Sequence, residues 1–133
     1  MNTLLLFTFV CVFVAAIQGA SVPRLWPAKE EQALENCSAE KNIPLELARK
    51  ILSHQLPAEN EDDKCLMSCY MKATNVLVNH KVNWESIYES HIAHIKDPET
   101  RERIKAIFKK CEENFTYEGK DDCQIAYDAY TCK

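Results

Sequence analysis

Apolar side chains recur along most of the chain at spacings of three and four residues, and polar or proline-containing breaks separate these stretches. This spacing puts the apolar side chains on one face of an α-helix. No segment shows the alternation that would predict a convincing strand. The pattern predicts an all-α fold of about six helices, which run from Pro27 to about Glu40, from Pro44 to before Pro57, from Asn60 to Met71 with an optional extension over Val76 to Val78, from Asn83 to Ile95, from Asp97 to Cys111 and from Cys123 to Cys132.

Several of these helices begin at a residue that favours a helix start. Asn60 and Asn83 can each cap a helix, and Asp97 precedes a proline in the first turn. Asp121 with Gln124 has the spacing of a capping box. The polar residues 79–83 predict a loop between the third and fourth helices.

The N-terminal stretch is apolar from Leu4 to Ile17 and is followed by Gly19 and Ala20. A short apolar run before small residues is typical of a secretory signal peptide. A retained membrane anchor is the alternative, but the run is short for a helix that spans a bilayer. We therefore expect a signal peptide over residues 1–20 and a secreted, extracellular domain over residues 21–133 that is not embedded in a membrane.

Removal of the signal peptide with Cys11 leaves six cysteines, and an even number in a small secreted chain indicates disulfides. Cys65 and Cys69 lie one turn apart on one helix face, where Cβ atoms are roughly 5–6 Å apart, whereas a disulfide needs about 3.8 Å. Cys123 and Cys132 would lie on the order of 13 Å apart along a helix. Neither pair can bond internally, and several pairings of the six cysteines satisfy these limits.

The composition excludes several classes of function. A formal net charge of −4 at pH 7 provides no basic surface for nucleic acid or for an anionic membrane. The patterns GxSxG and HExxH and a phosphate-binding loop are absent, and no histidine is followed by the aspartate that small secreted phospholipases need. We expect no enzyme, no nucleic-acid partner and no cofactor.

Two spacings resemble those of metal ligands. Cys65 with Cys69 could bind zinc as thiolates, and His91 with His94 could add imidazoles. In an oxidising compartment the thiols are instead consumed by disulfides. His91 and His94 fall on a polar helix flank, where we expect solvated side chains, so no metal site is expected.

Helices joined by disulfides can keep their spacing around a cavity, because covalent links offset the lost packing, which costs roughly 24 cal/mol per Å³ of void. An apolar cavity would bind small apolar molecules, and Met67 and Met71 would suit an adaptable wall. The alternative is that the same side chains fill a solid core. Periodicity alone favours the solid core.

The cysteine spacing after the signal peptide is C-x27-C-x3-C-x41-C-x11-C-x8-C. It resembles that of the insect odorant-binding proteins, the six-cysteine pheromone-binding and general odorant-binding type, over the whole mature chain. The resemblance implies about six helices around an apolar cavity and the disulfides Cys37–Cys69, Cys65–Cys123 and Cys111–Cys132. It also implies a carrier of odorants, pheromones or other lipophiles through aqueous lymph, as a monomer or weak homodimer, with a chemosensory receptor as a candidate partner.

The same resemblance suggests which residues line the cavity. Tyr127 or Tyr130 could offer a hydroxyl to a ligand oxygen, and the alternative is a core tyrosine bonded to the backbone. Counted from the cysteines, the ligand-binding positions of the family correspond to Leu47, Ile51, Leu52, Met67, Met71, Leu77, Ile87, Ile104, Phe108, Tyr127 and Tyr130.

The chain departs from moth pheromone-binding proteins in two ways. It stops at Lys133, one residue after the last cysteine, and Lys109 stands where some moth members have histidine. A release mechanism driven by a C-terminal tail at low pH is therefore not expected. His80 lies in the loop that often covers the cavity, and its protonation near pH 6 could loosen that loop. The alternative is an exposed histidine without a role.

Two further possibilities remain open from the sequence. Asn36-Cys37-Ser38 and Asn114-Phe115-Thr116 both fit the glycosylation pattern, but the first contains a cysteine that we expect in a disulfide. The alternative function is a secreted helical factor, such as a gland or reproductive-fluid protein, a signal or a toxin, that acts through its surface.

Overall fold

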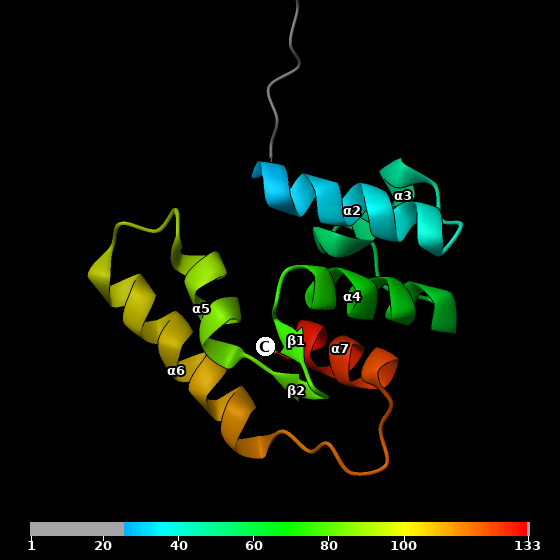
Figure 1. Cartoon of the computed structure of the whole chain (residues 1–133). Coiled ribbons are helices and arrows are strands. Elements are labelled where there is room, and N and C mark those ends of the chain that lie inside the picture. Colours follow the sequence, from blue (N-terminus) through cyan, green and yellow to red (C-terminus); the bar gives the residue numbers. More distant parts are fainter. Residues whose placement is uncertain (1–25, 133) are drawn as a thin grey trace, which may run out of the picture.

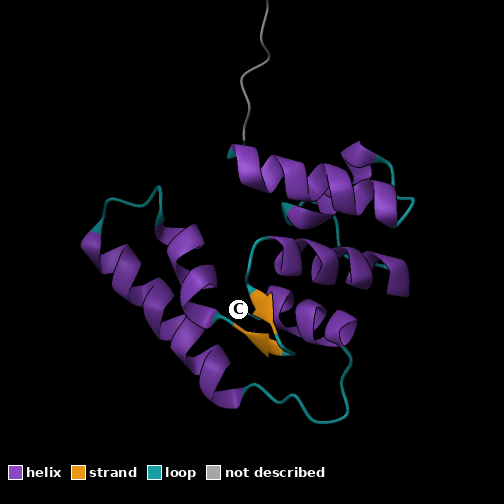
Figure 2. Ribbon diagram, in the orientation of Figure 1, coloured by secondary structure: helices purple, strands orange, loops and turns teal. Residues whose placement is uncertain are grey.

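The computed structural model describes residues 26–132, so the expected signal peptide lies outside the described residues. Within this range the expected all-α class with about six helices is confirmed, with one short hairpin added (Figures 1 and 2). The elements are α2 (Ala28–Glu40), α3 (Leu45–Leu52), α4 (Glu61–Ala73), β1 (Leu77–Val78), β2 (Lys81–Val82), α5 (Trp84–Ile92), α6 (Pro98–Asn114) and α7 (Asp122–Thr131).

Side chains cap the helix starts as the sequence predicts. The side-chain oxygens of Asn60, Asn83, Asp97 and Asp121 each accept a hydrogen bond from the backbone N–H three residues later, at 2.8–3.2 Å. These bonds satisfy N–H groups that have no partner within the helix. The side-chain caps therefore determine where these four helices begin.

The capping box expected at Asp121 is formed on one side only. The Asp121 carboxylate accepts the N–H of Gln124 at 2.8 Å. The Gln124 side chain, however, accepts a hydrogen bond from Lys64 at 3.1 Å and donates one to Asp128 at 2.7 Å. Packing of α7 against α4 brings Lys64 within reach, and this tertiary contact replaces the local one.

The boundaries of two predicted helices are wrong. Helix α4 ends at Ala73 rather than continuing over Val76 to Val78, and α5 ends at Ile92 rather than Ile95. Residues 77–82, whose polar part was expected to be a loop, form an antiparallel hairpin with Leu77 opposite Val82. Asn79 and His80 at its turn have φ values of 49° and 63°. Positive φ at both turn residues suits a tight hairpin, and strands this short leave no detectable alternation in the sequence.

Helix α4 is the centre of the fold. It packs against α7 on one side and against α2 and α3 on the other (Figure 1). We call these four helices, α2, α3, α4 and α7, the stack. The fully buried residues Leu34, Ile51, Leu66 and Ile125 come from these four helices. Two disulfides start from α4, because Cys69 bonds to Cys37 of α2 and Cys65 bonds to Cys123 of α7. With Cys111–Cys132, they are the pairs that the resemblance implies.

Helices α5 and α6 form a second part, which we call the α5–α6 arm (residues 84–114). They pack chiefly against each other and stand apart from the stack in Figure 1. At the base of the arm, Trp84 packs edge-on against Phe115, with ring centroids 5.1 Å apart. In the last turn of α6, Cys111 forms a disulfide with Cys132, which ties the arm to the end of α7. The arm therefore has few attachments to the stack.

Candidate ligand-binding site

A pocket of about 760 Å³ lies between the stack and the α5–α6 arm, and it opens to solvent. Its volume falls within the usual range for small-molecule sites. The stack contributes side chains from the start of α2, the end of α3, α4 and α7. The arm contributes α5, α6 and the loop between them. Most of the lining side chains are aliphatic or aromatic, so the pocket is suited to apolar molecules.

The structure brings some of the sequence-predicted residues together on the pocket wall. These residues come from five helices, which is why no local pattern groups them. The predicted residues that line the pocket are Leu52, Met71, Ile87, Ile104, Phe108 and Tyr130.

The other five predicted residues lie away from the pocket lining. Ile51, Met67 and Leu77 are buried in the core of the stack. Leu47 points outward from α3 and is 40% exposed. Tyr127 lies under the ammonium group of Lys64, which is 4.7 Å from the ring centroid. Core and pocket positions carry the same residue types, and only the packing of the helices separates them.

The tyrosines that meet the pocket differ in their hydrogen bonds. The Tyr130 hydroxyl donates to the backbone carbonyl of Leu52, as in the alternative that the sequence left open. Tyr70, one turn from Met67 on α4, also lines the pocket, and its hydroxyl makes no hydrogen bond to any described residue. Burial raises the pKa of Tyr70, with smaller effects from Glu30 and Glu31. Its hydroxyl therefore stays protonated and can donate to a ligand.

Several lining residues were missed at the level of sequence. His54, His91 and His94 reach the pocket; the last two remain exposed, as expected for a polar flank, yet stand at its rim. The His91 ring packs against Phe108 with centroids 4.9 Å apart, and its Nδ1 lies 2.8 Å from the carbonyl oxygen of Ile87. Ile87, His91 and Ile95 are spaced four residues apart and would share one side of the predicted helix, but nothing local shows that this side meets a pocket.

His80 lies outside the pocket lining, at the hairpin turn. Its Nδ1 is 2.7 Å from Oδ1 of Asp122, whose other oxygen accepts from Lys72 at 2.6 Å. A protonated His80 would face a carboxylate and hold this contact more tightly. The geometry therefore gives no support to the hypothesis that protonation of His80 loosens a cover over the pocket.

The Asp122 contacts predict a dependence of stability on pH. The hydrogen bond from Lys72, and after it that from His80, lowers the pKa of Asp122 below its ordinary value. A lowered pKa means that the ionised carboxylate stabilises the fold above about pH 4 and that this stabilisation is lost as the pH falls through the folded-state value. We expect Asp122→Asn to be less stable than the parent protein in urea unfolding at pH 7, with a smaller difference at about pH 3, because Asp122 of the parent protein is then losing its charge. An equal difference at both pH values would contradict this account.

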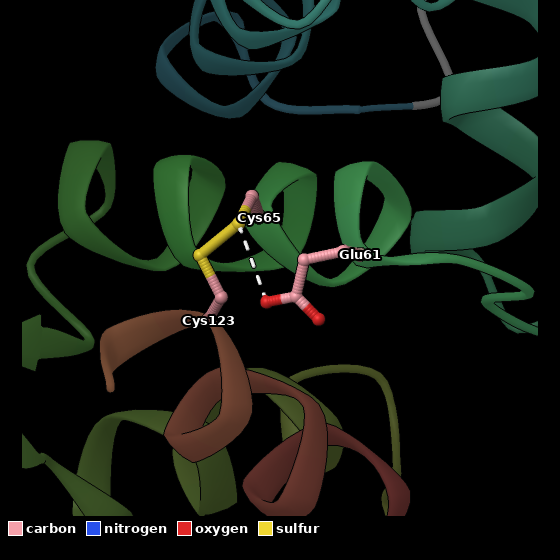
Figure 3. A group of neighbouring side chains, drawn as sticks. All are labelled: Glu61, Cys65 and Cys123. Carbon is pink, nitrogen blue, oxygen red and sulfur yellow. Dashed lines mark hydrogen bonds between the residues drawn. A yellow bond between two sulfur atoms is a disulfide. The ribbon is translucent and has the colours of Figure 1, made fainter. Parts of the chain in front are cut away.

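Glu61, Cys65 and Cys123 form the one group among the described residues with spacing suited to a metal ion (Figure 3). The two sulfurs are bonded to each other, so neither is available as a thiolate ligand. The Glu61 Oε1 atom lies 4.0 Å from Cys65 Sγ, and a disulfide sulfur has no proton to donate. The group is therefore a disulfide with a neighbouring carboxylate.

None of the described helices has the length and apolar character needed to cross a bilayer. No curated protein and no solved structure shows significant similarity to the chain. A family model, that of the PBP/GOBP family, matches residues 26–133, which include the six helices that the structure describes and the pocket. The chain therefore belongs to the PBP/GOBP family, the insect odorant- and pheromone-binding proteins.

Proposed function

We propose that this protein is a secreted carrier that binds small apolar ligands in the pocket between the stack and the α5–α6 arm and moves odorants or pheromones through aqueous lymph, without chemistry on the ligand. The observation that carries the proposal is the pocket of about 760 Å³ with its largely apolar lining, in a chain of a ligand-binding family. A free hydroxyl at Tyr70 supplies a donor that can orient a ligand oxygen.

The energetics suit reversible binding. A ligand that buries about 300 Å² of apolar surface gains roughly 7 kcal/mol at 25 cal/mol per Å². Part of this gain is offset by the freedom that the ligand loses on binding. The net affinity is therefore expected to allow uptake in dilute solution and release at a target.

Dye displacement tests the proposal against a factor that acts through its surface. The full chain is expressed in insect cells and the protein is purified from the medium. We expect its N-terminus to lie after Gly19 or Ala20, as measured by intact mass. We also expect N-phenyl-1-naphthylamine to fluoresce on binding and to be displaced by small volatile alcohols. If the fluorescence of the dye does not increase in the presence of the protein, the pocket does not bind it, and the alternative of a factor that acts through its surface is favoured.

A substitution in the pocket locates the binding. Ile104 lines the pocket from α6, whereas Leu47 is exposed on α3 and away from it. The larger side chain of Ile104→Trp should fill part of the pocket and weaken dye binding at least tenfold, which corresponds to about 1.4 kcal/mol of binding free energy. Leu47→Trp introduces the same ring elsewhere and should leave the affinity unchanged. If Leu47→Trp weakened binding and Ile104→Trp did not, the ligand would bind near Leu47 on α3 and not in this pocket.

A further inference from the structure

Glu30 stands at the end of the pocket formed by the start of α2. It is half-buried and lines the pocket together with Trp26 and Tyr70, whose rings meet edge-on with centroids 5.8 Å apart. Its neighbour Glu31 is held by Arg49, with an N–O distance of 2.9 Å. The Glu30 side chain makes no hydrogen bond or ion pair with any described residue. Its carboxylate is thus available to a ligand.

The charge of Glu30 reaches into the pocket. Burial is the main reason why the pKa values of Tyr70 and Tyr130 are raised, but the negative charge of Glu30 adds to the effect on both. No lysine or arginine is among the lining residues, and Glu30 is the only carboxylate among them. Glu30 therefore places a carboxylate at one end of an apolar space. The Arg49 guanidinium lies 5.8 Å from the Trp26 ring centroid at the same end, but it is paired with Glu31.

Placement in the first turn of α2 does not by itself explain this arrangement. An acidic residue there interacts favourably with the helix dipole, and Glu31 serves the dipole equally well while paired with Arg49. The dipole does not require that a residue of the first turn line an apolar pocket. A ligand with complementary charge accounts for this placement.

We propose that the pocket prefers cationic amphiphiles, ligands that join a protonated amine to an apolar body. This inference rests on the proposed function and specifies its ligand class. The ammonium group pairs with the Glu30 carboxylate at the end of the pocket that Tyr70 also lines, and cation–π attraction to the Tyr70 ring adds to the ion pair. The Trp26 ring already has the Arg49 guanidinium near it. The apolar body extends along Met71 and Phe108. A ligand that ends in a carboxylate meets repulsion at the same place.

Three ligands with the same chain separate charge from apolar burial. Octylamine, 1-octanol and octanoate are compared by displacement of N-phenyl-1-naphthylamine at pH 7.4, where the amine is protonated and the acid ionised. We expect octylamine to bind about tenfold more tightly than 1-octanol, and octanoate more weakly than either. The preference should shrink between 0.05 and 0.5 M NaCl, because salt screens a partly exposed charge pair; the Debye length falls from roughly 14 Å to about 4 Å.

Glu30→Gln removes the charge and keeps the shape of the side chain. It should reduce the ratio of octylamine affinity to 1-octanol affinity to about twofold or less, and this ratio is the readout. Glu35→Gln is the matched control, because Glu35 is an exposed residue of the same helix and does not line the pocket. It removes the same charge from the molecule and should keep the preference. Circular dichroism checks that both variants are folded.

The outcomes distinguish this inference from the proposed function. If 1-octanol displaces the dye and octylamine is no better, the preference for cations is wrong and the carrier function stands. The same conclusion follows if Glu30→Gln keeps the octylamine preference. If none of the three ligands displaces the dye, both the inference and the proposed function are overturned.

Discussion

Replacement of Cys65 and Cys123 with alanine is expected to lower the free energy of unfolding by about 4 kcal/mol. The disulfide closes a loop with a sequence separation of 58, the longest of the three. In the chain-entropy model, stabilisation grows with the logarithm of loop length, because a longer loop restricts the unfolded chain more. Since small proteins are stable by only about 5–15 kcal/mol, this loss is a large share of the total.

Urea unfolding of three double variants tests this account. Alanine at Cys37 and Cys69 and at Cys111 and Cys132 opens loops with separations of 32 and 21. The expected losses are between about 3 and 4 kcal/mol and fall in the order of loop length. If the variant without Cys65–Cys123 were the most stable of the three, a mechanism in the folded state would outweigh the entropy of the unfolded chain.

Replacement of Cys111 and Cys132 with alanine is expected to weaken ligand binding more than tenfold while the stack stays folded. This disulfide ties α6 to the end of α7, and the α5–α6 arm otherwise packs chiefly on itself. Ile87, Ile104 and Phe108 of the arm form one side of the pocket. Without the covalent link the arm can move away from the stack, and the ligand loses part of its apolar contact.

Hydrogen exchange separates loosening of the arm from general unfolding. Residues of α5 and α6 should exchange faster in this variant, whereas α4 and α7 should keep their protection. The double variant at Cys37 and Cys69 is the control, since neither residue lines the pocket. Faster exchange throughout the chain, or unchanged dye affinity, would show that the disulfide does not hold the α5–α6 arm in place beside the pocket.

Helix positions and class were predictable because their causes are local. The side-chain caps at Asn60, Asn83 and Asp97 act over three residues, and the apolar repeats act over one or two turns. The exclusion of a Cys65–Cys69 disulfide was equally local. The predictions became wrong where a distant segment intervened, as at the side chain of Gln124, which Lys64 of α4 draws away from the cap of its own helix.

The sequence by itself determined which residues are apolar, where the helices begin and that two cysteines of one helix must bond elsewhere. Only the tertiary structure decided that Met71, which is buried in the core like Met67, also lines the pocket, whereas Met67 does not. Other helices cover both faces of α4, so burial alone does not separate the two residues. It also placed Glu30 in the lining of the same pocket as Trp26 and Tyr70. A pocket forms between segments that are far apart in the chain, so its members share no period or spacing that a single sequence could display.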